Sequence, residues 1–192
     1  MDFMQQTVAM TGIAPIELPG EIELSRAIPT AVALAPQHLR GAVELICVAI
    51  AENTVTGDVA AFAKDDTVKQ SIKGLMADHL LDEGRHSGFW SRMVRIYWHT
   101  ASEEDRQCIA RILPVFIGHY LTNDIQKSFD FRLIDALRIS DTARHALRRE
   151  VSGLAFPINR HHPLVTNIVR FFHSSSLLDS PCVQRALIDY LI

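Results

Sequence analysis

The chain has 192 residues, of which 48% are hydrophobic and 21% charged, and its formal net charge is −3. This length suffices for one domain with a substantial core, and the composition excludes a disordered chain. Charges of both signs are interspersed, so neither nucleic acid nor an anionic membrane is an expected partner.

Leader and membrane signals are weak. The first 20 residues show no basic segment followed by an apolar core, so we predict no signal peptide. The longest strongly apolar run, residues 45–51, is too short to cross a bilayer. The three cysteines have no paired spacing, which argues against a disulfide framework and favours a reducing, cytoplasmic location.

The hydrophobic pattern predicts an all-α fold, because apolar residues recur mostly at intervals of three and four. We expect residues 1–21 to form an extended N-terminal arm and residues 22–192 to form one helical domain. Pro29 and Pro36 should break the next stretch and leave at most a short helix between them.

Two long helices are predicted next, joined by a tight turn with capping residues at 65–67. The first begins at Pro36, a favourable first-turn residue, and runs to about residue 64. The second runs from about residue 68 to residue 99. Its aromatic residues are interpreted as core, and they are Phe89, Trp90, Tyr97 and Trp98.

Several shorter helices complete the prediction. Residues 102–105, Ser-Glu-Glu-Asp, form a capping signature for a helix that tolerates Pro114 or kinks there. Further helices are expected at 125–138, 141–153 and 163–174. Ser180 and Pro181 should begin the last one, as N-cap and first helical residue.

The candidate site lies at residues 78–86, Asp-His-Leu-Leu-Asp-Glu-Gly-Arg-His. His79, Glu83 and His86 occupy positions i, i+4 and i+7 and therefore share one face of the second long helix. The zinc-protease pattern His-Glu-x-x-His is absent. The segment does contain Glu-x-x-His, which helix bundles use to bind iron or manganese together with a lone Glu from a neighbouring helix.

Glu52 is the candidate for that lone Glu, because it lies in the most apolar segment of the first long helix. An isolated buried carboxylate costs several kcal/mol and therefore needs a cationic partner. Glu52 lies 14 residues before the turn near residue 66, and His79 and Glu83 lie 13 and 17 residues after it. In an antiparallel helix pair these side chains lie level within about one turn.

Two interpretations of these four residues remain open, a metal site and a buried hydrogen-bond network. Mixed carboxylate and imidazole ligands favour iron or manganese over structural zinc, although zinc would also bind. Asp82 either accepts a hydrogen bond from a ligand histidine or is an exposed helix charge. Arg85 is expected to be a structural ion-pair partner.

The segments AENTVTGDVAAFAKDD and HLLDEGRH resemble the C-terminal half of the p-aminobenzoate N-oxygenase family of ferritin-like di-iron oxygenases. The resemblance covers roughly residues 22–180. It implies a ferritin-like bundle in which iron is bound by Glu52, His79, Glu83 and His86. We choose Glu83, which is central to the motif, as the bridging carboxylate. It also implies two irons that activate O₂ and oxygenate an amine nitrogen, typically of an arylamine, and manganese is the other candidate metal.

The sequence departs from that family in one respect. Family members carry an earlier half with another Glu and another Glu-x-x-His, and no second Glu-x-x-His occurs in these 192 residues. Three explanations are open: a fragment of an oxygenase, a homodimer that completes the site, or a non-catalytic metal-binding or dimerisation module derived from one. For the isolated chain we expect self-association or instability, no more than about one metal per chain and little N-oxygenation.

Overall fold

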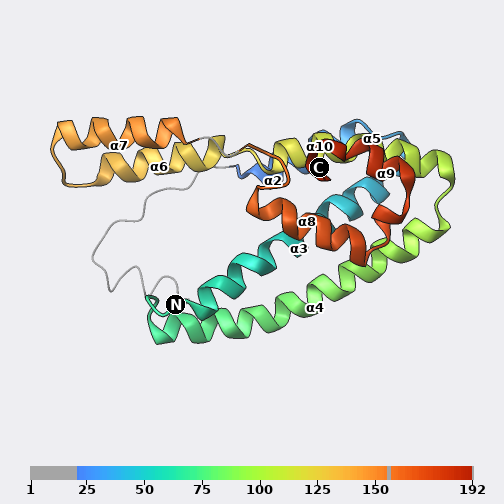
Figure 1. Ribbon diagram of the computed structural model, residues 1–192, viewed down its shortest axis with the longest axis horizontal. Helices are drawn as coiled ribbons and strands as arrows, with labels where there is room; N and C mark the ends of the chain where they lie inside the picture. The colour runs from blue at the N-terminus through green and yellow to red at the C-terminus, as the bar shows by residue number, and fades with distance from the viewer. Residues whose placement is uncertain (1–20, 155–156, 192) are drawn as a thin grey trace. The chain divides into compact units, whose positions relative to one another are not determined.

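The computed structural model describes residues 21–154 and 157–191, and every regular element among them is helical (Figure 1). This confirms the predicted all-α class. None of the described helices combines the length and the hydrophobicity that a bilayer span requires. Residues 1–20 of the predicted N-terminal arm lie outside the described residues.

The described residues form two compact units. Helices α6 (Asp124–Ala136) and α7 (Asp141–Gly153) pack together in the smaller unit, close to the predicted bounds. The Arg144 guanidinium donates to the carbonyl groups of Ile134, Asp135 and Leu137, and so caps the C-terminal end of α6. The prediction of one domain over residues 22–192 stays a prediction.

The larger unit begins with α2 (Glu23–Ala33), and here the expected break at Pro29 is wrong. Pro29 lies inside the helix, where it removes one backbone hydrogen bond. Ala27 and Ala31 are completely buried on either side of it, and α2 packs against α3 and α5. The free energy gained by burying these two alanines therefore outweighs the cost of the missing backbone hydrogen bond.

The two predicted long helices are α3 (Arg40–Lys64), preceded by the short 3₁₀ helix η1 (Gln37–Leu39), and α4 (Gln70–Thr100). They run antiparallel and side by side (Figure 1). The turn between them lies where the sequence placed it. Hydrogen bonds from the Thr67 hydroxyl and backbone N–H hold the pKa of Asp65 below its usual value.

Helix α5 (Glu103–Tyr120) begins as predicted, because the Ser102 hydroxyl accepts a hydrogen bond from the Asp105 backbone N–H at 3.1 Å. Pro114 lies within this helix. The C-terminal elements follow the predicted order, and they are α8 (Pro163–Ser174), η2 (Leu177–Asp179), α9 (Pro181–Ala186) and α10 (Ile188–Leu191).

The last predicted helix is interrupted at Leu187, between α9 and α10. Ser180 is the N-cap residue of α9, but its side chain makes no capping bond. Its hydroxyl instead accepts a hydrogen bond from Trp98 Nε1 at 2.9 Å. A buried indole N–H needs an acceptor, and Ser180 provides it.

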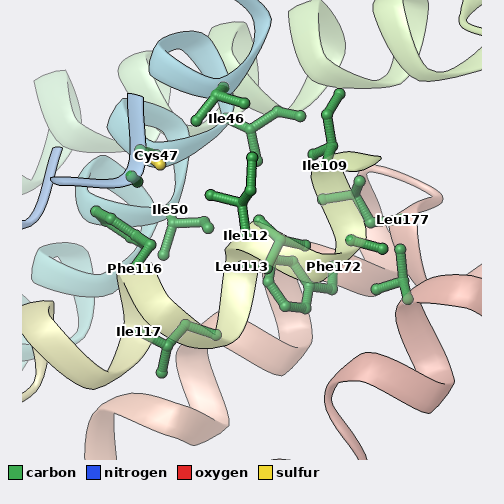
Figure 2. Packing of buried hydrophobic residues seen from close by; sticks show 14 of the residues in the cluster. Ile46, Cys47, Ile50, Ile109, Ile112, Leu113, Phe116, Ile117, Phe172 and Leu177 are labelled. Atoms are coloured by element: carbon green, nitrogen blue, oxygen red, sulfur yellow. The ribbon is translucent and has the colours of Figure 1, made fainter. Parts of the chain in front are cut away.

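The core lies where α3, α5 and α8 meet (Figure 2). Ile46 and Ile50 of α3 pack there with Leu113 of α5 and Phe172 of α8, and each is at most 1% exposed. Of the aromatic residues assigned to the core of α4, Trp98 is buried and Trp90 and Tyr97 are half-buried. Phe89 is 56% exposed, so its assignment to the core is wrong.

Leu113→Ala should lower the free energy of unfolding by about 2–5 kcal/mol, because it leaves a cavity in the closely packed core. Leu34→Ala is the matched control, since Leu34 is 55% exposed and its truncation should change stability by about 0.5 kcal/mol or less. Urea unfolding followed by circular dichroism measures both. Equal losses would contradict this placement of the core.

Candidate metal centre

Three predicted ligands come together between α3 and α4. One ligand atom each from Glu52, Glu83 and His86 lies within 4.8 Å of the other two. His86 Nδ1 is 3.8 Å from Glu52 Oε2 and 3.9 Å from Glu83 Oε2. Among the residues that the structure describes, no other group of three or more His, Cys, Asp or Glu side chains meets the same spacing.

The fourth predicted ligand, His79, lies on the other side of Glu83. Its Nε2 atom is 3.3 Å from Glu83 Oε1, but His79 is not one of the three side chains that share the 4.8 Å spacing. Glu83 is therefore the central residue, with a histidine one turn away in each direction along α4. The assignment of all four residues as metal ligands stays a prediction.

Burial differs sharply across the site. The Glu83 side chain is only 11% exposed, whereas those of His79 and His86 are 49% and 55% exposed. Glu52 is intermediate, at 35%. The buried base of the centre is thus a carboxylate, and the histidines form its rim towards solvent.

The donor set is of a kind that can hold a metal ion. The distances of 3.8 and 3.9 Å around His86 exceed the 2.7–3.2 Å typical of N–H···O bonds. Ligands at about 2.0–2.2 Å from one ion lie about 3 Å or slightly more from one another, so small side-chain movements suffice to bind a metal here. Two carboxylates with imidazole nitrogens form the kind of set that holds iron or manganese with open positions.

The residues beside the ligands are now placed as well. Arg85 donates to Asp82 Oδ1 at 2.9 Å, and both side chains are exposed. This agrees with the interpretation of Asp82 as an exposed helix charge and of Arg85 as its ion-pair partner. Among the described contacts of α4, Asp82 is thus paired with Arg85, while His79 and His86 both face Glu83.

Sequence analysis missed a second polar contact between the same helices. The Ser87 hydroxyl donates to Asn53 Oδ1, and these residues directly follow His86 and Glu52 in the chain. The signal that would have found Asn53 is the one used for Glu52, a polar side chain in the most apolar part of α3. Ser87 has no such signal, because serine is common on exposed helix faces.

An apolar stripe runs along α4 beside the exposed histidines. Phe89, Met93 and Ile96 are 56%, 39% and 57% exposed, and their spacing of four and three residues places them on one side of the helix. At 100° per residue this side adjoins the face that carries His86. The open rim of the candidate centre is therefore bordered by exposed apolar side chains.

An all-α protein with carboxylates and histidines gathered between two antiparallel helices has the architecture of the carboxylate-bound metal proteins built on helix bundles. A family model described as P-aminobenzoate N-oxygenase AurF matches residues 1–156. The chain belongs to the p-aminobenzoate N-oxygenase family. The matched region contains all four predicted ligands and extends to the N-terminal side of the resemblance seen in the sequence. No curated protein and no solved structure matches the chain.

Glu83→Gln should weaken binding of Co(II), used as a spectroscopic substitute for Fe(II), by about 100-fold or more, because it removes the charge at the centre of the donor set. The matched control is Asp82→Asn, which removes the neighbouring exposed carboxylate and should change the dissociation constant by less than about twofold. Titration followed by visible absorption measures both constants. Equal affinity of Glu83→Gln and the unmodified chain would contradict the assignment of Glu83.

Proposed function

We propose that the protein functions as an iron-dependent N-oxygenase that uses O₂ to oxygenate the nitrogen of an arylamine-like substrate. The observation that carries the proposal is the buried Glu83 carboxylate, flanked by two histidines of its own helix and close to Glu52 of the neighbouring helix. Membership of the p-aminobenzoate N-oxygenase family supports this chemistry.

The reaction proposed is the first oxygenation step, R–NH₂ + O₂ + 2 e⁻ + 2 H⁺ → R–NHOH + H₂O. An external donor supplies the electrons. Iron, when bound by Glu52, Glu83 and His86 with His79, would supply the O₂ activation.

The protein's own residues set the conditions of this reaction. The two carboxylates offset the positive charge of a bound cation, and the neutral imidazoles leave the total charge close to balanced. Because Glu83 is buried beneath the half-exposed histidines, it would hold the cation from the protein interior, and the histidines would hold it from the rim.

Glu52, Glu83 and His86 make half of the four carboxylates and two histidines that a two-iron site uses, and His79 is an additional ligand. We infer that further protein covers the rim and supplies the remaining carboxylates and histidine, either as an additional polypeptide segment or as a second copy of the chain. The exposure of His79 and His86 and the apolar stripe of Phe89, Met93 and Ile96 support this inference. Exposed apolar surfaces of this kind mark interaction sites.

The same stripe favours a second candidate function, a non-catalytic helical module that binds metal or dimerises through α4. This module would retain the ligand geometry and the apolar surface but would not turn over an amine. Metal content, oligomeric state and turnover therefore separate the two functions when they are measured on the same sample.

The cysteines support the cytoplasm as the proposed compartment. All three are free, and burial raises the pKa of the Cys47 thiol to about 12, with the charge of Glu44 adding to the effect. A thiol with this pKa is unreactive at neutral pH.

Expressed alone, the 192-residue chain should bind no more than about one iron, self-associate and oxygenate little or no p-aminobenzoate, because half of the ligand set is missing. Co-expression with the N-terminal half of another family member should raise the iron content to about two per complex and produce O₂-dependent hydroxylamine, detected by mass spectrometry. Elemental analysis and light scattering measure the metal content and the assembly.

In that complex Glu83→Gln should abolish the product, and Asp82→Asn should leave it. A fully iron-loaded complex that consumes no O₂ with the amine would support the non-catalytic module. A monomeric chain that carries two irons and turns over the amine by itself would show that the missing ligands have been misidentified.

A further inference from the structure

Two side-chain pairs connect α3 to α4 at neighbouring positions. Glu52 faces His86 at 3.8 Å, and Asn53 accepts a hydrogen bond from Ser87. Each member of the second pair directly follows a member of the first. Because successive helical residues point about 100° apart, the two pairs face different sides of the contact between the helices. The Asn53–Ser87 hydrogen bond therefore lies beside the candidate metal site.

The Asn53 amide is held in one orientation by several partners. Its Nδ2 atom donates to the Ala49 carbonyl at 2.7 Å, within its own helix, while its Oδ1 atom accepts from Ser87 and, at 3.5 Å, from Ser91. The Ser174 hydroxyl of α8 donates to the Phe171 carbonyl at 2.9 Å, and its oxygen lies 3.3 Å from Ser91 Oγ. The Asn53–Ser87 hydrogen bond is thus supported by a bond within α3 and by Ser91 of α4.

A pocket borders this hydrogen bond on one side. A pocket of about 370 Å³ lies on this side of the helix pair, and Asn53 and Ser87 line it together with α8 residues such as Asn167 and Phe171. Close-packed side chains elsewhere in a core resist sliding of one helix along another. Beside the pocket, the directional hydrogen bond between Asn53 and Ser87 adds to the packing that resists sliding.

The position of α3 along α4 matters for one ligand above all. Glu83 and His86 belong to the same helix, so their separation does not depend on the neighbouring helix. Glu52 comes from α3, and a slip of one residue would move it by about 1.5 Å along the helix axis. Metal–ligand distances tolerate only about 0.2 Å.

We propose that Asn53 and Ser87 are positioning residues that hold α3 and α4 in the register at which Glu52 reaches the centre formed by Glu83 and His86. This inference rests on the proposed metal site. Neither residue needs to touch the ion. Loss of the hydrogen bond should therefore act like partial loss of Glu52, while the ligands of α4 keep their arrangement.

Asn53→Ala should weaken Co(II) binding by about 10- to 100-fold, the range seen when an orienting group outside the ligand set is removed. The matched control is Asn167→Ala. Asn167 donates to the Thr54 carbonyl at 3.2 Å, an interhelical bond that joins α8 to α3 and not the two ligand-bearing helices. This control should leave the Co(II) dissociation constant within about twofold.

Two further readouts separate positioning from general destabilisation. The visible spectrum of bound Co(II) in Asn53→Ala should shift towards that of Glu52→Gln, and the two substitutions should be non-additive in binding free energy because they remove the same ligand. Ser87→Thr, which keeps the hydroxyl, should bind Co(II) like the unmodified chain, whereas Ser87→Ala should not. If Asn53→Ala does not fold, the comparison of Ser87→Thr with Ser87→Ala tests the positioning role.

Unchanged Co(II) affinity and spectrum in both Asn53→Ala and Ser87→Ala would overturn the positioning role and leave the proposed metal site intact. Equal weakening by Asn167→Ala would also overturn it, since the effect would then be general. An unmodified chain that binds neither Co(II) nor Fe(II) would overturn the proposed function and the positioning role with it.

Discussion

The antiparallel packing of α3 against α4 is the contact on which the candidate function depends. Every predicted ligand lies on one of these two helices, and the three that converge do so only because Glu52 is level with Glu83 and His86. Spacing within one helix is set by backbone hydrogen bonds and hardly varies. The spacing between helices has no such covalent or local constraint, so it must be set by side chains.

The two ends of α3 are held in different ways. Towards the N-terminus, Ile46 and Ile50 are packed against α5 and α8, and this part of α3 belongs to the main core (Figure 2). Near Glu52 the contacts become polar, with Asn53 bonded to Ser87 and the Asn167 amide bonded to the Thr54 carbonyl. The site thus lies at the edge of the core, where an ionisable group can be partly buried and still have polar partners.

Glu83 is likewise buried and has polar partners. A carboxylate with an 11% exposed side chain is costly unless it is paired, and His79 and His86 lie within 4 Å on either side of it. Such an arrangement contributes little to stability compared with an apolar side chain of similar volume. Under the proposed function, this carboxylate lies in a helix that also buries Val94 and Trp98 because it holds the cation.

The sequence by itself determined the features that arise from short-range periodicity and capping. These include the all-α class, the limits of most helices, the Ser102 cap, and the shared face of His79, Glu83 and His86. Even the level of Glu52 followed from counting residues on both sides of the turn, because helical rise is constant.

Only the tertiary structure decided the features that depend on what surrounds a residue. Pro29 is accepted inside α2 because Ala27 and Ala31 are buried there, and Phe89 is exposed although its neighbours Trp90 and Trp98 pack inward. The Ser180 hydroxyl accepts a hydrogen bond from Trp98 and does not cap its own helix. The bond between Asn53 and Ser87 joins residues 34 apart in the chain, and no local pattern marks such a pair. Packing between distant segments outweighs local preference at each of these positions, and it is visible only in three dimensions.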